Sequence, residues 1–162
     1  MPETVMVRRT PSSVDEMRLL QNRIMHRAYE LFEQNGSHFG NDLGNWIRAE
    51  REMIWKPPME IRESDKEIVI EAAISGIDPK DIEIEATPED MILKAETCHD
   101  HAHKEGTVHL CEFESGKMFR YMQFPKRINP DKVKAEVKNG LLRITAEIAE
   151  EARVRKIKPE AA

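Results

Sequence analysis

The pair Asn139-Gly140 constrains the fold of this 162-residue chain more than any other part of its sequence. Asn-Gly is the preferred pair of a type I′ turn, because both central residues adopt a positive φ angle. Apolar residues alternate with polar ones on both sides of the pair, at Val133, Ala135 and Val137 before it and at Leu142, Ile144, Ala146 and Ile148 after it. A two-residue loop sets the register and places these side chains on one face, with the pairs Val137–Leu142, Ala135–Ile144 and Val133–Ala146. The sequence therefore predicts an antiparallel β-hairpin here.

Further alternating segments precede the hairpin and predict more strands, at residues 59–62, 68–74, 82–86, 91–93 and 118–125. Breaker residues separate these segments, and residues 128–131 are predicted to form a turn. No helical pattern of about 10–15 residues lies between the strands, which excludes parallel βαβ units. The sequence therefore predicts an all-β core, built as an antiparallel β-sandwich.

The first third of the chain has a helical pattern instead. Ser13 and Glu16 fit a capping box and Gly36 fits a helix stop, so residues 14–35 are predicted to form one amphipathic helix. A second, shorter helical pattern follows the glycine-rich link that begins at Gly36. The first eleven residues are short and polar, and we expect them to be frayed.

The pattern changes from helical to strand-like at Trp55-Lys56-Pro57-Pro58. Two consecutive prolines end a helix and favour an extended backbone. We therefore place a domain boundary here and expect three parts: a helical arm (residues 1–54), the β-sandwich (55–148) and a short flexible tail (149–162).

The apolar residues of the arm permit two interpretations. They could pack against their own domain or against a copy of it, as ordinary core, or they could form a mobile surface that captures other proteins. Methionine and aromatic side chains adapt to irregular surfaces, which suits the second interpretation. The residues concerned are Met17, Leu20, Ile24, Met25, Leu31, Phe32, Trp46, Ile47, Met53 and Ile54.

The charge and composition of the chain exclude several classes of function. The formal net charge is -5, whereas phosphate binding needs a basic face, so no nucleic-acid partner is expected. No apolar run approaches the ~20 residues of a membrane span, and no signal peptide is recognised. Two cysteines make no disulfide framework, so we expect a cytoplasmic protein. Nucleotide-binding, esterase and zinc-protease motifs are missing from the sequence, so neither an enzyme nor a cofactor is expected.

A cluster of histidines and cysteines lies between the predicted strands, in residues 98–111. Its candidates for a tetrahedral zinc site are Cys98, His101, His103 and Cys111. Their spacing matches no regular zinc finger or ribbon. The alternative is a solvated loop that is rich in histidine.

Several motifs of the sandwich resemble one family in the same order along the chain. The hairpin sequence Ala135-x-x-x-Asn139-Gly140-Leu141-Leu142 resembles the A-x-x-x-N-G-V-L signature of the α-crystallin domain of small heat-shock proteins. Trp55-x-Pro57 resembles the W-x-P entry of bacterial members, and residues 75–82 resemble P-G-V-x-x-E-D-I, with Ser75 in place of proline. Residues 118–125 are similar to the family's S-F-x-R-x-F-x-L-P. The resemblance covers residues 55–148 and implies an immunoglobulin-like sandwich.

The resemblance also implies surfaces for self-association. It implies a homodimer by strand exchange, with interface residues Val108, Leu110, Glu112, Phe119 and Arg120. Arg120 is then expected to bridge subunits, although an exposed arginine worth about 0–1 kcal/mol is the alternative. It further implies a groove between strands 82–86 and 132–137, lined by Ile82, Ile84, Val133, Ala135 and Val137, which binds the I-x-I/V tail motif of a neighbouring dimer.

The tail of this chain departs from that motif. Val154 and Ile157 are three residues apart, so an extended chain points them to opposite faces. Two adjacent pockets cannot both be filled in that way, and assembly beyond the dimer by tail docking is not expected.

The resemblance implies an ATP-independent holdase chaperone, which binds partly unfolded proteins and keeps them from aggregating. The expected partners are unfolded or partly folded proteins and a second copy of the chain. Two other functions stay open at this point: a metal-binding module that uses residues 98–111, and a co-chaperone adaptor that binds one folded partner on the same kind of sandwich.

Overall fold

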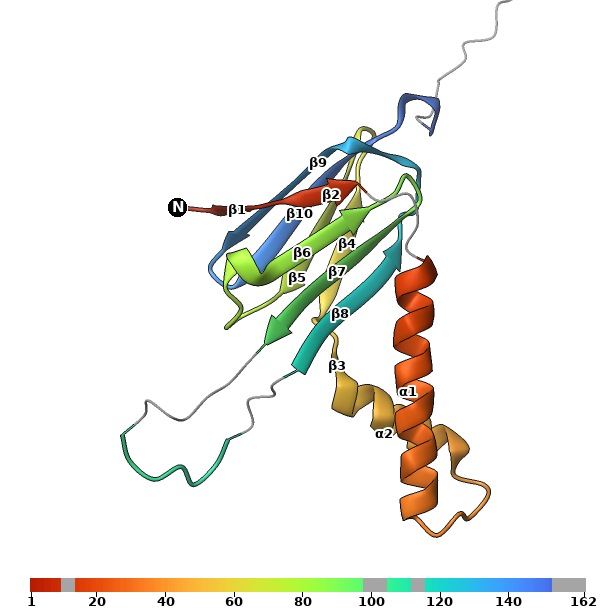
Figure 1. The fold of residues 1–162 in the computed structure, drawn as a ribbon. Helices are drawn as coiled ribbons and strands as arrows, with labels where there is room; N and C mark the ends of the chain where they lie inside the picture. The colour runs from red at the N-terminus through yellow and green to blue at the C-terminus, as the bar shows by residue number, and fades with distance from the viewer. Residues whose placement is uncertain (10–13, 98–104, 112–115, 153–162) are drawn as a thin grey trace, which may run out of the picture.

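The computed structural model is a sandwich of two five-stranded sheets, with two helices against one of them (Figure 1). It describes residues 1–9, 14–97, 105–111 and 116–152. The helices are α1 (Val14–Gln34) and α2 (Asp42–Met53), and 3₁₀ turns lie at Pro79–Asp81 and Glu150–Ala152. The strands are β1 (Glu3–Val5), β2 (Val7–Arg9), β3 (Ile54–Trp55), β4 (Met59–Glu63), β5 (Glu67–Ala73), β6 (Ile82–Ala86), β7 (Asp90–Thr97), β8 (Gly116–Gln123), β9 (Ile128–Lys138) and β10 (Leu141–Ile148).

Sheet A has the strand order β1-β9-β10-β5-β4, and sheet B has the order β2-β6-β7-β8-β3. Most neighbouring strands are antiparallel, which confirms the predicted all-β, immunoglobulin-like sandwich. The exceptions are β2 and β3, each of which adds to sheet B in parallel. Along β5, β6 and β10 every second side chain is buried, because one face of each strand meets the core. Fully buried core residues include Ile68, Ile70, Ile84, Met91, Leu93, Met118, Leu142 and Ile144.

The predicted hairpin is formed by β9 and β10, in the predicted register. Leu142 lies opposite Val137, Ile144 opposite Ala135 and Ala146 opposite Val133. The turn residues Asn139 and Gly140 have φ angles of 52° and 76°, as a type I′ turn requires. The amide of Ile74 donates a hydrogen bond to the carbonyl of Gly140 at 2.9 Å, so the turn also holds the chain beside Ser75.

Replacing Gly140 with alanine is expected to destabilise the sandwich more than the same change at Gly76. Both glycines have positive φ, which costs an L-residue roughly 1–2 kcal/mol. Only at Gly140 would the new Cβ also meet a close neighbour, the Oγ of Ser75 at 2.6 Å, whereas nothing lies within 4 Å at Gly76. Urea unfolding of both variants measures the difference in free energy. Adding Ser75→Ala to Gly140→Ala should remove most of that difference, and an unchanged difference would contradict the contact.

The turn predicted at residues 128–131 is wrong, since these residues begin β9. The chain bends earlier, around Pro125, and Ile128 is already buried opposite Ile148. The turn-like sequence is accommodated as an irregularity inside the strand. The register shifts between Ala146 and Ile148, and the side chain of Asn129 accepts a hydrogen bond from the amide of Asp131 at 3.0 Å.

The prediction that the first eleven residues are frayed is also wrong for residues 3–9, which form β1 and β2. β1 pairs with β9 of sheet A, and β2 pairs with β6 of sheet B. These two strands therefore cover edges that would otherwise leave backbone N–H and C=O groups unpaired. The partners are distant in sequence, which is why a local pattern did not predict them.

The two helices confirm the predicted helical character of the arm. α1 matches the prediction for residues 14–35 to within one residue, while Ser13 of the predicted capping box lies outside the described residues. α2 ends at Met53, so Ile54, which was grouped with the second helix, instead opens the short strand β3 beside β8.

Candidate functional site

An apolar layer joins the helical hairpin, α1 and α2, to the outer face of sheet B. Ile24 and Leu31 of α1 and Ala49 of α2 are buried in it, against Ile92 of β7 and Phe119 of β8. This cluster is separate from the core between the two sheets. Its partly buried members are Met17, Leu20, Ala28, Trp46, Met53 and Tyr121.

A cavity of about 400 Å³ opens between α1, α2 and β8. Its walls are mostly apolar, and charged side chains complete the lining. The lining residues are Met17, Leu20, Gln21, Ile24, Trp46, Glu50, Ile54, Lys56, Phe119, Arg120 and Tyr121. Apolar walls with a few polar groups are typical of sites that bind apolar side chains or ligands.

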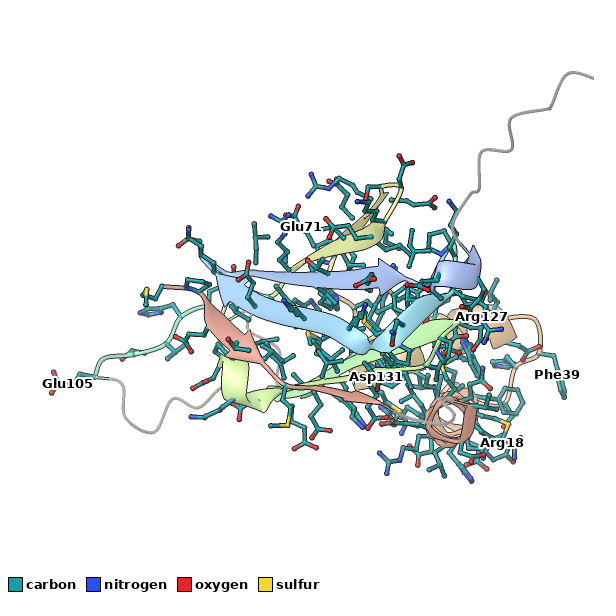
Figure 2. The ribbon with its side chains drawn as sticks, turned by 90° about the horizontal axis from the view of Figure 1, so that it is seen from above. Arg18, Phe39, Glu71, Glu105, Arg127 and Asp131 are labelled. Carbon is teal, nitrogen blue, oxygen red and sulfur yellow. The ribbon has the colours of Figure 1, made fainter. Side chains whose placement is uncertain are left out.

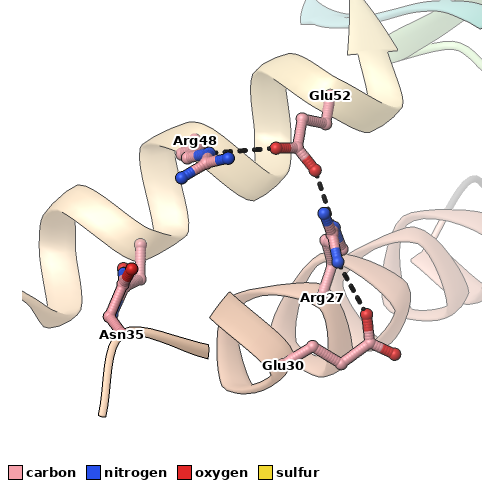
Figure 3. Close-up of polar contacts among 6 residues, drawn as sticks. Arg27, Glu30, Asn35, Arg48 and Glu52 are labelled. Carbon is pink, nitrogen blue, oxygen red and sulfur yellow. Dashed lines mark hydrogen bonds and ion pairs between the residues drawn. The ribbon is translucent and has the colours of Figure 1, made fainter. Parts of the chain in front are cut away.

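Polar contacts link the two helices (Figure 3). Arg27 of α1 donates to Glu52 of α2 at 2.6 Å and to Glu30 at 2.9 Å, and Arg48 donates to Glu52 at 3.0 Å. The hydrogen bond from Arg27 lowers the pKa of Glu52 below its usual value. The contacts lie at the surface, so they set the angle between the helices and contribute little stability.

Lys94 of β7 forms an ion pair with the first turn of α1 and so links this helix to sheet B. Its Nζ lies 3.0 Å from a carboxylate oxygen of Glu16 on α1, and also contacts Glu85 at 3.2 Å and Glu83 at 3.5 Å on β6. The Lys94 side chain is only 17% exposed. Burial lowers its pKa, but the hydrogen bonds to Glu16 and Glu85 outweigh burial and leave the pKa above its ordinary value. Lys94 is therefore a charged link between the hairpin and the sandwich.

The structure divides the ten predicted arm residues into three groups. Ile24, Leu31 and Ile54 are buried; Met17, Leu20, Phe32, Trp46 and Met53 are half-buried; Met25 and Ile47 are exposed. Exposed apolar residues of the two helices and their link that the sequence analysis did not select are Val14, Leu19, Tyr29, Phe39 and Leu43. Figure 2, which looks along α1, shows Phe39 at the edge of the molecule. Phe39 and Leu43 lie in or beside the glycine-rich link, where no periodic pattern marks them.

The predicted groove residues lie together between β6 and β9. Ile82, Ile84 and Ala135 are buried, while Val133 and Val137 are half-buried against the same core. The groove is covered by residues 3–9 of the same chain, and Val5 is only 3% exposed there.

The predicted dimer residues are found in different environments. Phe119 is buried under the helical hairpin, and Arg120 lines the cavity beside it. Val108 and Leu110 are exposed. The pattern of residues 108–113 predicts an extended segment; its described part, 108–111, contains no strand, and residues 112 and 113 lie outside the described residues. Glu112 lies outside the described residues. The interface itself stays a prediction.

The predicted metal ligands are mostly outside the described part of the chain. Cys98, His101 and His103 are not described, and Cys111 is an exposed free thiol. Within residues 1–9, 14–97, 105–111 and 116–152, no group of three or more histidine, cysteine or acidic side chains could hold a metal ion. None of the helices in these ranges is long and apolar enough to cross a membrane.

The fold and its outer layer thus define an α-crystallin-type sandwich with a helical hairpin docked on one sheet. A family model for the Hsp20/alpha crystallin family matches residues 60–159, and the chain belongs to this family of small heat-shock proteins. A second model, for a protein family of unknown function (DUF2934), matches residues 20–53, which cover most of the helical hairpin.

Relatives and solved structures agree with this assignment. The chain is 31% identical over 101 residues to small heat shock protein C2 of Rickettsia felis, and 27% identical over 89 residues to spore protein SP21 of Stigmatella aurantiaca. These alignments cover 62% and 55% of this chain but only 66% and 53% of the relatives. Heat shock protein 16.0 of Schizosaccharomyces pombe matches 66% of this chain and 99% of its own, with a TM-score of 0.56 and 19% identity. A small heat-shock protein of Xylella fastidiosa gives 0.53 at 24% identity, covering 66% and 98%. Both structures show a shared fold.

Proposed function

We propose that the chain is an ATP-independent holdase, which binds partly unfolded proteins and suppresses their aggregation. Membership of the small heat-shock family supports a chaperone role. The observation that carries the proposal is the apolar layer between the helical hairpin and sheet B, because it can be opened without disturbing the core between the sheets. We also propose a cytoplasmic location. Disulfide bonds are rare in cytosolic proteins, and the two cysteines of this chain make no disulfide framework.

The apolar layer has the chemistry that unfolded clients present. Client chains expose apolar side chains and unpaired strand edges. Burying ~500 Å² of client apolar area would contribute roughly 12 kcal/mol before the entropic costs of binding. A client segment that takes the place of the hairpin replaces one apolar contact with another, so the net cost of opening is small. Methionine and aromatic side chains such as Met17, Met53 and Trp46 then adapt to different client sequences.

Light scattering tests this function directly. A model client such as citrate synthase is heated with increasing amounts of the full-length protein, with and without ATP. We expect suppression that is complete near stoichiometric subunit ratios and unaffected by ATP. No suppression at a several-fold excess would contradict the holdase and would favour an adaptor that binds a single folded partner.

We further propose that the chain dimerises by strand exchange. β4 is the outermost described strand of sheet A, so one of its edges is free for a partner strand, and Ile61 on it is exposed. Val108 and Leu110 are exposed apolar side chains with alternating spacing, as a strand that pairs elsewhere would have. Pairing of residues 108–113 with β4 of a second copy would satisfy the backbone groups of both edges.

Replacing Leu110 with aspartate is expected to weaken this dimer more than tenfold. Leu110 is 77% exposed in the single chain, so the change should cost nothing in folding, but it would bury a charge in the interface. Sedimentation at a series of concentrations measures the dissociation constant. Leu43→Asp is the matched control, because Leu43 is 72% exposed on α2. Equal dissociation constants for the two variants would contradict strand exchange through residues 108–113.

A further inference from the structure

The cavity between α1, α2 and β8 is lined by the two parts of the chain that the proposed function separates. Met17 of α1 and Trp46 of α2 belong to the helical hairpin, whereas Phe119 and Tyr121 belong to the sandwich. The volume of about 400 Å³ falls within the range of roughly 300–1,000 Å³ that is typical of small-molecule sites. A ligand in this cavity would therefore contact the hairpin and the sandwich together, and only while the two are docked.

The lining of the cavity requires a ligand with an apolar body. Ile24, Ile54 and Phe119 are buried, and their side chains offer no hydrogen bond. Met17 and Trp46 are half-buried, and such side chains adapt to the shape of an apolar group beside them. A flexible alkyl chain suits this lining.

The charged groups of the lining include one cation without a counter-ion. The Nζ of Lys56 lies 2.5 Å from a carboxylate oxygen of Glu50, so these two charges offset each other. The hydroxyl of Tyr121 donates to Asp90 at 3.2 Å. Arg120 is half-buried, and among the residues that the structure describes it has no ion pair. A guanidinium in this position favours a carboxylate, which it can bind through two parallel hydrogen bonds.

We propose that this cavity binds a free fatty acid, with the alkyl chain against the apolar lining and the carboxylate on Arg120. Such a ligand would supply within one chain the carboxylate that the family resemblance expects from a second subunit. The cavity lies between hairpin and sandwich, so it takes a single detached molecule and not the surface of a bilayer. A ligand that binds only the docked state stabilises that state. If the proposed function is right, on which this consequence rests, the fatty acid keeps the apolar layer closed to clients.

Quenching by 12-bromododecanoate tests the site without any client. Bromine quenches tryptophan emission on contact, and Trp46 lines the cavity whereas Trp55 packs against the core between the sheets. The full-length protein is titrated below the concentration at which the probe forms micelles. We expect saturable quenching with one probe per chain, and none in Trp46→Phe, which retains Trp55. Quenching that does not saturate, or that persists in Trp46→Phe, would overturn the site.

A neutral probe of the same length tests the role of Arg120. Adventitious apolar binding would favour 12-bromododecanol, because burial of an unpaired carboxylate is costly. We expect the opposite order in the unmodified protein, with the carboxylate bound roughly tenfold or more tightly than the alcohol. Arg120→Gln should remove this preference and leave the affinity for the alcohol unchanged. Tighter binding of the alcohol by the unmodified protein would overturn the proposal even if the variant does not fold.

Arg143→Gln is the matched control, because it removes the same charge from β10 of the other sheet, where Arg143 is 51% exposed. It should retain the preference for the carboxylate. An equal loss of preference in both arginine variants would show that net charge, not Arg120, selects the ligand, and would overturn the assignment.

Light scattering with dodecanoate then tests the regulatory consequence. The fatty acid should raise the temperature at which the unmodified protein begins to suppress client aggregation, and should have no effect on Arg120→Gln. Unchanged suppression at saturating dodecanoate would overturn the regulatory role. If the protein suppresses aggregation but Trp46 is not quenched, only the ligand site is wrong. If Trp46 is quenched as expected but no suppression occurs without ligand, the holdase is wrong and the site stands.

Discussion

Replacing Phe119 with alanine is expected to release the helical hairpin from sheet B and to leave the sandwich folded. Phe119 is 4% exposed and lies in the apolar layer between hairpin and sheet, not in the core between the sheets. Truncating a buried phenylalanine costs about 3–5 kcal/mol through lost contacts and the cavity left behind. That loss falls on docking of the hairpin, because Phe119 shares this layer with Ile24 and Leu31 of α1 and Ala49 of α2.

Three measurements separate release from general unfolding. Far-ultraviolet circular dichroism should retain the β-sheet signal. Tryptophan emission should shift to the red, since Trp46 lines the layer that opens, whereas Trp55 packs against the sandwich core. At temperatures where the unmodified protein suppresses client aggregation only weakly, the variant should suppress it several-fold more.

Phe124→Ala is the matched control for this prediction. Phe124 is also buried, but it belongs to the core between the sheets. The control should lower the unfolding temperature without a selective gain in suppression. If Phe119→Ala releases the hairpin and suppression does not rise, the apolar layer is ordinary packing and the proposed client surface is wrong.

The sequence predicted correctly those parts of the fold that depend on residues close together along the chain. The hairpin follows from Asn139-Gly140 and the alternation around it, so its register was correct at every predicted pair. The helical period of residues 14–35 indicated an apolar face, and Ile24 and Leu31 on that face are buried, but whether they bind clients stays a prediction. The helical period did not identify which structural element this apolar face contacts.

The parts that were missed depend on contacts between distant residues. Val5 and Val7 are too few to form a periodic pattern. Val5 is buried and Val7 is partly buried only because β6 and β9 lie beside them. Phe119 was assigned to a dimer interface by resemblance, whereas its environment in one chain is set by the helical hairpin. The family motifs lie in the sandwich and carry no information on a hairpin that matches a separate family model.

Replacing Lys94 with glutamate is expected to loosen the start of α1 without affecting the core. The substitution removes the cation that contacts Glu16, Glu83 and Glu85, and it places a fourth carboxylate among them. Lost charge-assisted hydrogen bonds contribute on the order of 1–2 kcal/mol, and repulsion between the carboxylates adds to this. The hairpin should therefore open at lower temperature, with more suppression of client aggregation below the normal threshold.

Salt and pH give this prediction a distinct signature. In the unmodified protein, 1 M salt should also favour opening, because the screening length falls from about 8 Å at physiological ionic strength to about 3 Å. The pKa of Lys94 is raised in the folded state, so its stabilising contribution is complete below the unfolded value of about 10.4 and is lost only as pH rises through the folded pKa. Deprotonation of Lys94 should therefore not loosen the hairpin at neutral pH.

Lys80→Glu is the matched control for Lys94→Glu, because it makes the same change in net charge at an exposed lysine. Lys80 pairs with Asp78 at 2.9 Å, and both belong to the 3₁₀ turn before β6 and not to the hairpin. We expect Lys80→Glu to behave like the unmodified protein in tryptophan emission, in salt dependence and in client suppression. If both lysine variants open the hairpin equally, the effect comes from the overall charge of the chain. The link between Glu16 and Lys94 would then have no part in holding the apolar layer closed.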